Sequence, residues 1–108
     1  MVCMHVDLSR ALDKAGMTVT LSRYGDRKFE GNEYEPLSKP AVASLQADVD
    51  EIGALFCATV ARNRGIGAAT VRAMQGATFQ GAAGVAARLA DVCQAPDQAF
   101  ADLLAVLS

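Results

Sequence analysis

Lys28 is the side chain of this sequence best placed to do chemistry. It lies in the charged stretch Arg23–Ser38, which reads RYGDRKFEGNEYEPLS. A lysine becomes a base only when its pKa falls from about 10.4 toward neutrality, which requires burial or a neighbouring positive charge. Arg27 supplies such a charge, and Phe29 could help to exclude water. From these neighbours alone, an ordinary surface lysine remains the better interpretation.

Other groups with chemical potential have weaker support. His5 is the only histidine, and its apolar neighbours on an expected strand favour a structural, hydrogen-bonded role over a catalytic one. Glu30, Glu33 and Glu35 alternate along the loop and could bind a cation. They lack the spacing of a calcium loop, so a solvated acidic edge is the better interpretation. We therefore expect no metal and no cofactor.

The cysteines indicate no cross-link. They show no CxxC pair, which argues against a zinc site or a disulfide framework and favours buried, unreactive thiols. The residues are Cys3, Cys57 and Cys93.

Composition limits the class of protein. The 108 residues are 52% hydrophobic, with a formal charge of -2 and no basic cluster, which argues against nucleic-acid binding. No window has the length and hydropathy of a membrane span or targeting segment, so we expect a soluble, cytoplasmic chain. A chain this short and apolar is also expected to leave surface for another subunit or a further stretch of polypeptide to cover.

The elements before the loop are expected to form a β-α-β unit. Residues 2–6 and 17–22 show the alternation of strands, and between them Asp7 can cap a helix that Gly16 ends. Such a crossover places its two strands parallel. Function in parallel sheets lies at the carboxyl ends of strands, which is where the Lys28 loop begins.

The elements after the loop are mostly helical. Ser38 is expected to cap a long amphipathic helix whose apolar stripe runs from Val42 to Val60 and which ends near Gly65. Further helices are expected over 68–75, 81–89 and 96–107, with short strands at 78–80 and 90–93. The GIG of residues 65–67 is too short for a phosphate-binding loop.

Taken together, four blocks carry a family resemblance: MHVDLSRALDKAGMTVTL, YGDRKFEGNEYEPLS, ATVARNRG and VRAMQGATFQGAAGVAARLADV. The chain resembles the C-terminal part of the serine peptidases related to signal peptide peptidase A, in the phage branch of minor capsid protein C and prohead proteases. The resemblance implies an α/β fragment of a ClpP/crotonase-like fold, helix-rich with a short parallel sheet, in an oligomeric ring. It also implies peptide hydrolysis by a Ser-Lys dyad, with Lys28 of Gly25–Lys28 as general base.

The same resemblance places the nucleophilic serine upstream, in a glycine-rich turn that none of this chain's serines matches. Residues 1–108 are thus expected to form a single partial domain, inactive alone, whose partners are a peptide or protein substrate and further copies or a serine-bearing half. Ser22, Gln75 and Ala77 depart from the family pattern, which puts the substrate groove or subunit contacts in question. A non-catalytic oligomerisation or capsid-assembly module is the alternative, and an acyl-CoA-handling enzyme of the same superfold is a third.

Overall fold

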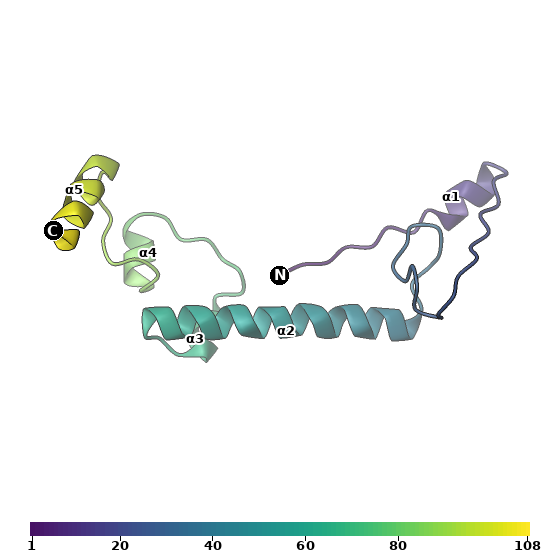
Figure 1. Cartoon of the computed structure of the whole chain (residues 1–108), viewed down its shortest axis with the longest axis horizontal. Coiled ribbons are helices and arrows are strands. Elements are labelled where there is room, and N and C mark those ends of the chain that lie inside the picture. Colours follow the sequence, from purple (N-terminus) through teal and green to yellow (C-terminus); the bar gives the residue numbers. More distant parts are fainter. The chain divides into compact units, whose positions relative to one another are not determined.

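The structure, a computed structural model, describes all of residues 1–108 and contains helices but no strand. The helices are α1 (Ser9–Lys14), α2 (Lys39–Arg64), α3 (Ala68–Ala73), α4 (Ala82–Ala86) and α5 (Pro96–Leu107) (Figure 1). The chain divides into two compact units, Met1–Leu55 and Phe56–Ser108, with the boundary inside α2. None of the helices combines the length and hydropathy needed to cross a bilayer.

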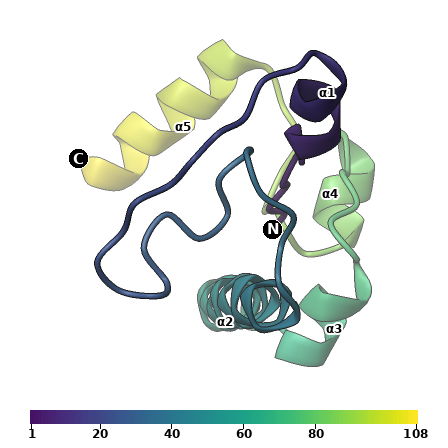
Figure 2. The ribbon, with the colours of Figure 1, turned by 90° about the vertical axis from the view of Figure 1, so that its right-hand side faces the viewer.

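The expected short parallel sheet is absent, so the α/β prediction was wrong. Neither ribbon view contains an arrow (Figures 1 and 2), and the expected strands at 2–6, 17–22, 78–80 and 90–93 have no strand structure. The Leu8 amide donates to the Glu33 carbonyl at 2.8 Å, but this contact starts no ladder. An alternation of apolar residues indicates which face of a strand would be buried. The strand itself forms only when a second segment hydrogen-bonds to its backbone.

Helix α1 ends as the sequence predicts. Gly16 has a φ of 74°, which a residue without a Cβ adopts freely. Its amide donates to Asp13 O at 3.0 Å, and the amide of Met17 donates to Leu12 O at 2.9 Å. These paired bonds form a Schellman motif, which satisfies two carbonyls at the helix end. At its start the N-cap residue is Leu8 and not Asp7 as expected, and the Asp7 side chain accepts from the Ser9 amide at 2.9 Å.

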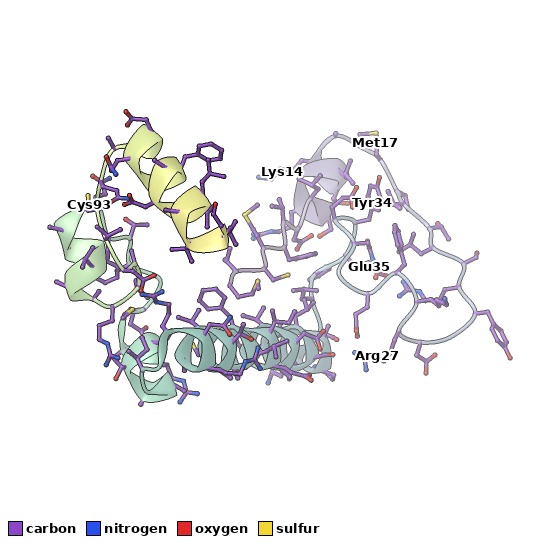
Figure 3. The ribbon with its side chains drawn as sticks, turned by 60° about the vertical axis from the view of Figure 1, so that its left-hand side comes forward. Lys14, Met17, Arg27, Tyr34, Glu35 and Cys93 are labelled. Carbon is purple, nitrogen blue, oxygen red and sulfur yellow. The ribbon has the colours of Figure 1, made fainter.

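Helix α2 is the longest element and begins at the expected cap. Ser38 precedes it, and its Oγ accepts from the Ala41 amide at 3.2 Å. Ala41 is buried, whereas Val42 on the expected apolar stripe is 51% exposed. Side chains stand out all around α2 in Figure 3. The helix therefore forms as predicted, but its apolar stripe is only partly covered.

In the second unit, one arginine joins the end of α2 to the segment after α4. Arg64 donates to both carboxylate oxygens of Asp91, at 2.8 and 3.2 Å, and to the carbonyl of Arg88 at 2.7 Å. A bidentate guanidinium–carboxylate pair of this kind fixes the geometry of the contact as well as its strength.

Very little hydrophobic surface is fully buried. Ala41 and Val71 are the buried hydrophobic residues, and many large ones are exposed, among them Val2, Met4, Phe56, Phe100 and Leu107. This agrees with the expectation that the chain leaves apolar surface uncovered, and what covers it stays a prediction. The expectation of buried thiols was wrong, because two of the three free cysteines are exposed.

Replacing the cap of α2 tests this account of its start. Ser38→Ala removes the acceptor of the Ala41 amide, so the free energy of unfolding is expected to fall by about 1 kcal/mol. Urea unfolding followed by circular dichroism measures the loss. Ser22→Ala is the matched control because its side chain makes no hydrogen bond, and equal stability of the two variants would contradict the capping role.

Candidate functional site

The Lys28 loop is a run of tight turns. Backbone amides donate three residues back, from Lys28 to Gly25 at 3.0 Å, from Glu30 to Arg27 at 3.2 Å and from Asn32 to Phe29 at 3.2 Å. Gly25 has a φ of 98°, and a Cβ there would lie 3.4 Å from Cγ of Lys28. Glycine thus allows the close turn on which Lys28 sits. The segment preceding the loop is unpaired, so the loop does not begin at the carboxyl end of a strand.

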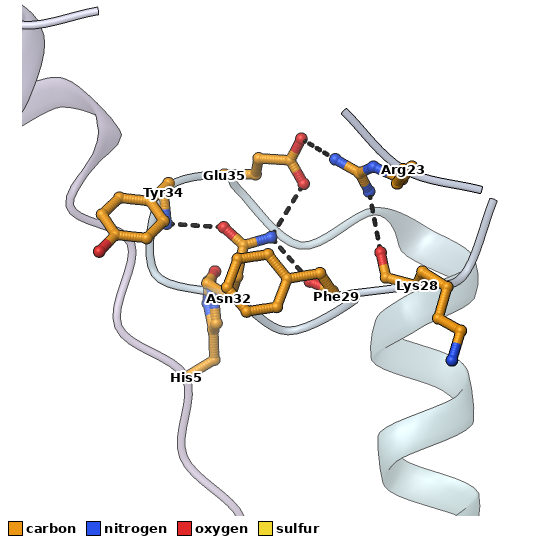
Figure 4. A network of polar contacts seen from close by, with 7 residues as sticks. All are labelled: His5, Arg23, Lys28, Phe29, Asn32, Tyr34 and Glu35. Atoms are coloured by element: carbon orange, nitrogen blue, oxygen red, sulfur yellow. Dashed lines mark hydrogen bonds and ion pairs between the residues drawn. The ribbon is translucent and has the colours of Figure 1, made fainter. Parts of the chain in front are cut away.

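Asn32 is the centre of the polar network that holds this loop (Figure 4). It is only 6% exposed. Its Nδ2 donates to Phe29 O at 2.7 Å and to Oε2 of Glu35 at 3.0 Å, and its Oδ1 accepts from the Tyr34 amide at 2.8 Å. The amide orientation follows from these partners, because a carbonyl only accepts and a backbone N–H only donates.

His5 ties the N-terminal segment to the same residue. Its Nε2 lies 2.7 Å from the carbonyl oxygen of Asn32. Since that oxygen can only accept, Nε2 carries the proton in this contact. The structural, hydrogen-bonded role predicted for His5 is therefore confirmed, although its segment is not a strand.

Glu35 extends the network to the backbone of Lys28. One guanidinium nitrogen of Arg23 pairs with Oε1 of Glu35, and the other donates to the carbonyl of Lys28 at 3.4 Å. The pKa of Glu35 lies below its ordinary value of 4.5, first because the Asn32 amide donates to the carboxylate and then because Arg23 does. Glu35 is therefore held as a charged acceptor within the loop.

Arg27 makes a second set of side-chain contacts in this loop. Arg27 (labelled in Figure 3) donates to Glu30 at 2.9 Å and to Oγ of Ser44, in α2, at 2.6 Å. Two of the three loop glutamates, Glu30 and Glu35, are thus ion-paired. The interpretation of these carboxylates as a merely solvated edge was therefore wrong for both. No group of His, Cys, Asp and Glu side chains is arranged to hold a metal ion.

Lys28 itself is exposed, and its amine takes part in no ion pair or hydrogen bond. Its side chain leads away from the Asn32 network in Figure 4. Phe29 is 57% exposed, so its ring does not exclude water as the sequence suggested. A cavity of about 210 Å³ is formed by the loop and the start of α2. Its lining residues include Arg23, Asn32 and Ser38 but not Lys28.

Sequence reasoning missed Asn32, Arg23 and Ser44 as parts of the site. Asn32 follows Gly31 directly, and an asparagine beside a glycine ordinarily indicates no more than a loop. Its central role depends on partners that are distant in sequence, such as His5, which lies 27 positions away. No local signal in the sequence distinguishes a buried asparagine of this kind from an exposed one.

The depressed pKa of Glu35 predicts a pH-dependent stability. Such a carboxylate stabilises the fold above its unfolded pKa, near 4.5, and this contribution is lost as pH falls through the lower folded pKa. Glu35→Gln is expected to unfold at lower urea concentration than the parent near neutral pH, with the difference vanishing in acid. Glu33→Gln is the control, because that side chain makes no hydrogen bond or ion pair, and a constant difference at all pH values would contradict the assignment.

Comparison with known proteins places the sequence in a family. The chain is 32% identical over 87 residues to the head-tail preconnector protein GP5 of Enterobacteria phage P21 and 30% identical over 87 residues to the capsid assembly protease C of Escherichia phage lambda. Each match covers 81% of this chain but only 17% and 20% of the relative. The model of peptidase family S49 matches residues 1–106. On this evidence the chain belongs to peptidase family S49.

Proposed function

We propose that this chain contributes Lys28 as the general base of a Ser-Lys dyad that hydrolyses peptide bonds. The observation that carries the proposal is the contrast between Lys28 and its charged neighbours. Arg23 and Arg27 are each paired with a glutamate, whereas the amine of Lys28 has no partner. A general base needs a free lone pair within reach of the proton it takes, and an amine bound to a carboxylate does not offer one.

In the proposed reaction the neutral amine of Lys28 takes the proton from a serine hydroxyl. The serine oxygen then forms a bond to the carbonyl carbon of the substrate, and the carbonyl π electrons move to oxygen. When the tetrahedral intermediate collapses, the C–N bond breaks and Lys28 returns the proton to the leaving amine. Water hydrolyses the acyl-enzyme by the same steps, with Lys28 again as base.

We place the nucleophile on a segment outside these 108 residues. Ser38 and Ser44 are engaged as acceptors at the start of α2 and at Arg27, and the hydroxyl of Ser108 donates to Leu104 O. The chain spans about a fifth or less of the length of the curated relatives it matches. Residues 1–108 would then act as one part of a peptidase domain.

The names of the relatives support a proposal for the substrate and partners. One of them is named a capsid assembly protease and another a head-tail preconnector. By analogy, this chain would act on a protein of phage capsid assembly and work beside further copies or a serine-bearing segment. The competing function is an assembly module without catalysis, and the exposed apolar residues of α5, such as Phe100 and Leu107, favour it.

Reconstituted cleavage of a peptide separates these two functions. The chain is assayed alone and mixed with the serine-bearing portion of the phage lambda capsid assembly protease C, using a fluorogenic peptide. We expect activity only in the mixture. Lys28→Ala should lower its kcat by at least about a hundredfold, because general-base catalysis contributes that much or more.

Lys14→Ala serves as the control, since Lys14 is another exposed lysine of the same unit. Its activity should equal that of the parent. Co-sedimentation of the two polypeptides establishes that they associate. An associated mixture without activity would refute the dyad role and favour the assembly module. A mixture in which Lys28→Ala stays active would refute the role of Lys28 as the base.

A further inference from the structure

Phe29, the residue that follows Lys28, has an unusual backbone conformation. Its φ is 63°, in the left-handed region where bulky residues are outliers. Such a conformation persists only where the surrounding structure enforces it, and it is found preferentially at functional sites. Because Phe29 adjoins Lys28, its backbone determines how the chain leaves the turn on which Lys28 sits.

The contacts that enforce this conformation converge on Asn32. The carbonyl before the Phe29 backbone, that of Lys28, accepts from Arg23 at 3.4 Å. The carbonyl after it, that of Phe29, accepts from Nδ2 of Asn32 at 2.7 Å. Glu35 links these two side chains, because its carboxylate accepts from both Arg23 and Asn32. Side chains thus hold the peptide groups on both sides of Phe29.

We propose that Asn32 is a positioning residue for Lys28: by holding the Phe29 backbone, it sets the direction in which the amine of Lys28 points. This inference rests on the proposed function of Lys28. It assigns to Asn32 no contact with substrate or with the reacting atoms. The role requires an amide, since the side chain must donate twice, to Phe29 and Glu35, and accept once, from Tyr34.

A positioning residue is needed because nothing holds the Lys28 side chain directly. Its amine has no hydrogen bond or ion pair, so only the backbone determines where the side chain starts. A displacement of about 1 Å in a reacting group can cost about a hundredfold in rate. Asparagine is better suited than aspartate here, because a carboxylate accepts only and would face the like charge of Glu35.

The kinetic test uses the reconstituted peptidase. Asn32→Asp and Asn32→Ala are each expected to lower kcat by about a hundredfold with KM unchanged. Asn63→Ala, which removes the chain's other asparagine, from the exposed surface of α2, is the matched control and should keep full activity. Lys28→Ala is assayed beside them to show whether the lysine matters at all.

A second test needs no activity and uses the chain by itself. Positive φ brings an amide hydrogen close to its own Hα, so Phe29 should give a strong intraresidue NOE in the parent chain and lose it in Asn32→Ala.

A rescue variant returns to the kinetic assay of the reconstituted peptidase. Adding Phe29→Gly to Asn32→Ala should restore part of kcat, because glycine adopts positive φ without strain. A general loss of folding would not be repaired by glycine at this position.

The outcomes separate the two proposals. If Phe29 keeps its NOE in Asn32→Ala, the positioning role of Asn32 is overturned. If kcat of the Asn32 variants stays at the level of Asn63→Ala while Lys28→Ala is inactive, the positioning role is overturned and the dyad role of Lys28 stands. If Lys28→Ala is fully active, the dyad role fails, and the positioning role that depends on it fails too.

Discussion

The structure of the first unit depends on satisfying one buried amide. Asn32 is the buried polar residue of this chain, and a buried polar group is costly unless it is hydrogen-bonded. Both side-chain donors, the side-chain acceptor and the backbone carbonyl of Asn32 have partners. Those partners lie in the N-terminal segment, the turn after Lys28 and the approach to α2. Meeting one local requirement therefore brings three segments of the chain together.

The arginines near Lys28 are paired, whereas Lys28 is not, and the Asn32 network accounts for one of these pairs. Arg23 is drawn toward Glu35, which the Asn32 amide already holds, and Arg27 is drawn toward Glu30 and Ser44. The loop therefore neutralises its arginines internally and leaves the lysine without a partner. In the proposed dyad this amine would be the base, whereas in a pure assembly module it would be an ordinary surface charge.

The helices of this protein could be predicted from sequence far better than its other parts. The Ser38 cap, the Gly16 terminus and Pro96 at the start of α5 act within a turn or two of their own position. Strand pairing has no such local determinant, because each strand depends on a backbone neighbour distant in sequence. Residues 17–22 therefore show the alternation typical of a strand but do not form one.

For the site, the sequence by itself determined the loop, which glycines and mixed charges mark. Its neighbours alone left Lys28 an ordinary surface lysine, and only the resemblance to a peptidase family singled it out. Only the tertiary structure decided which residues hold that loop, because His5 and Asn32 are 27 positions apart and Arg23 and Glu35 are 12 apart. Turn and cap preferences are encoded locally, whereas the burial of an amide and the pairing of distant charges arise only when the chain folds back on itself.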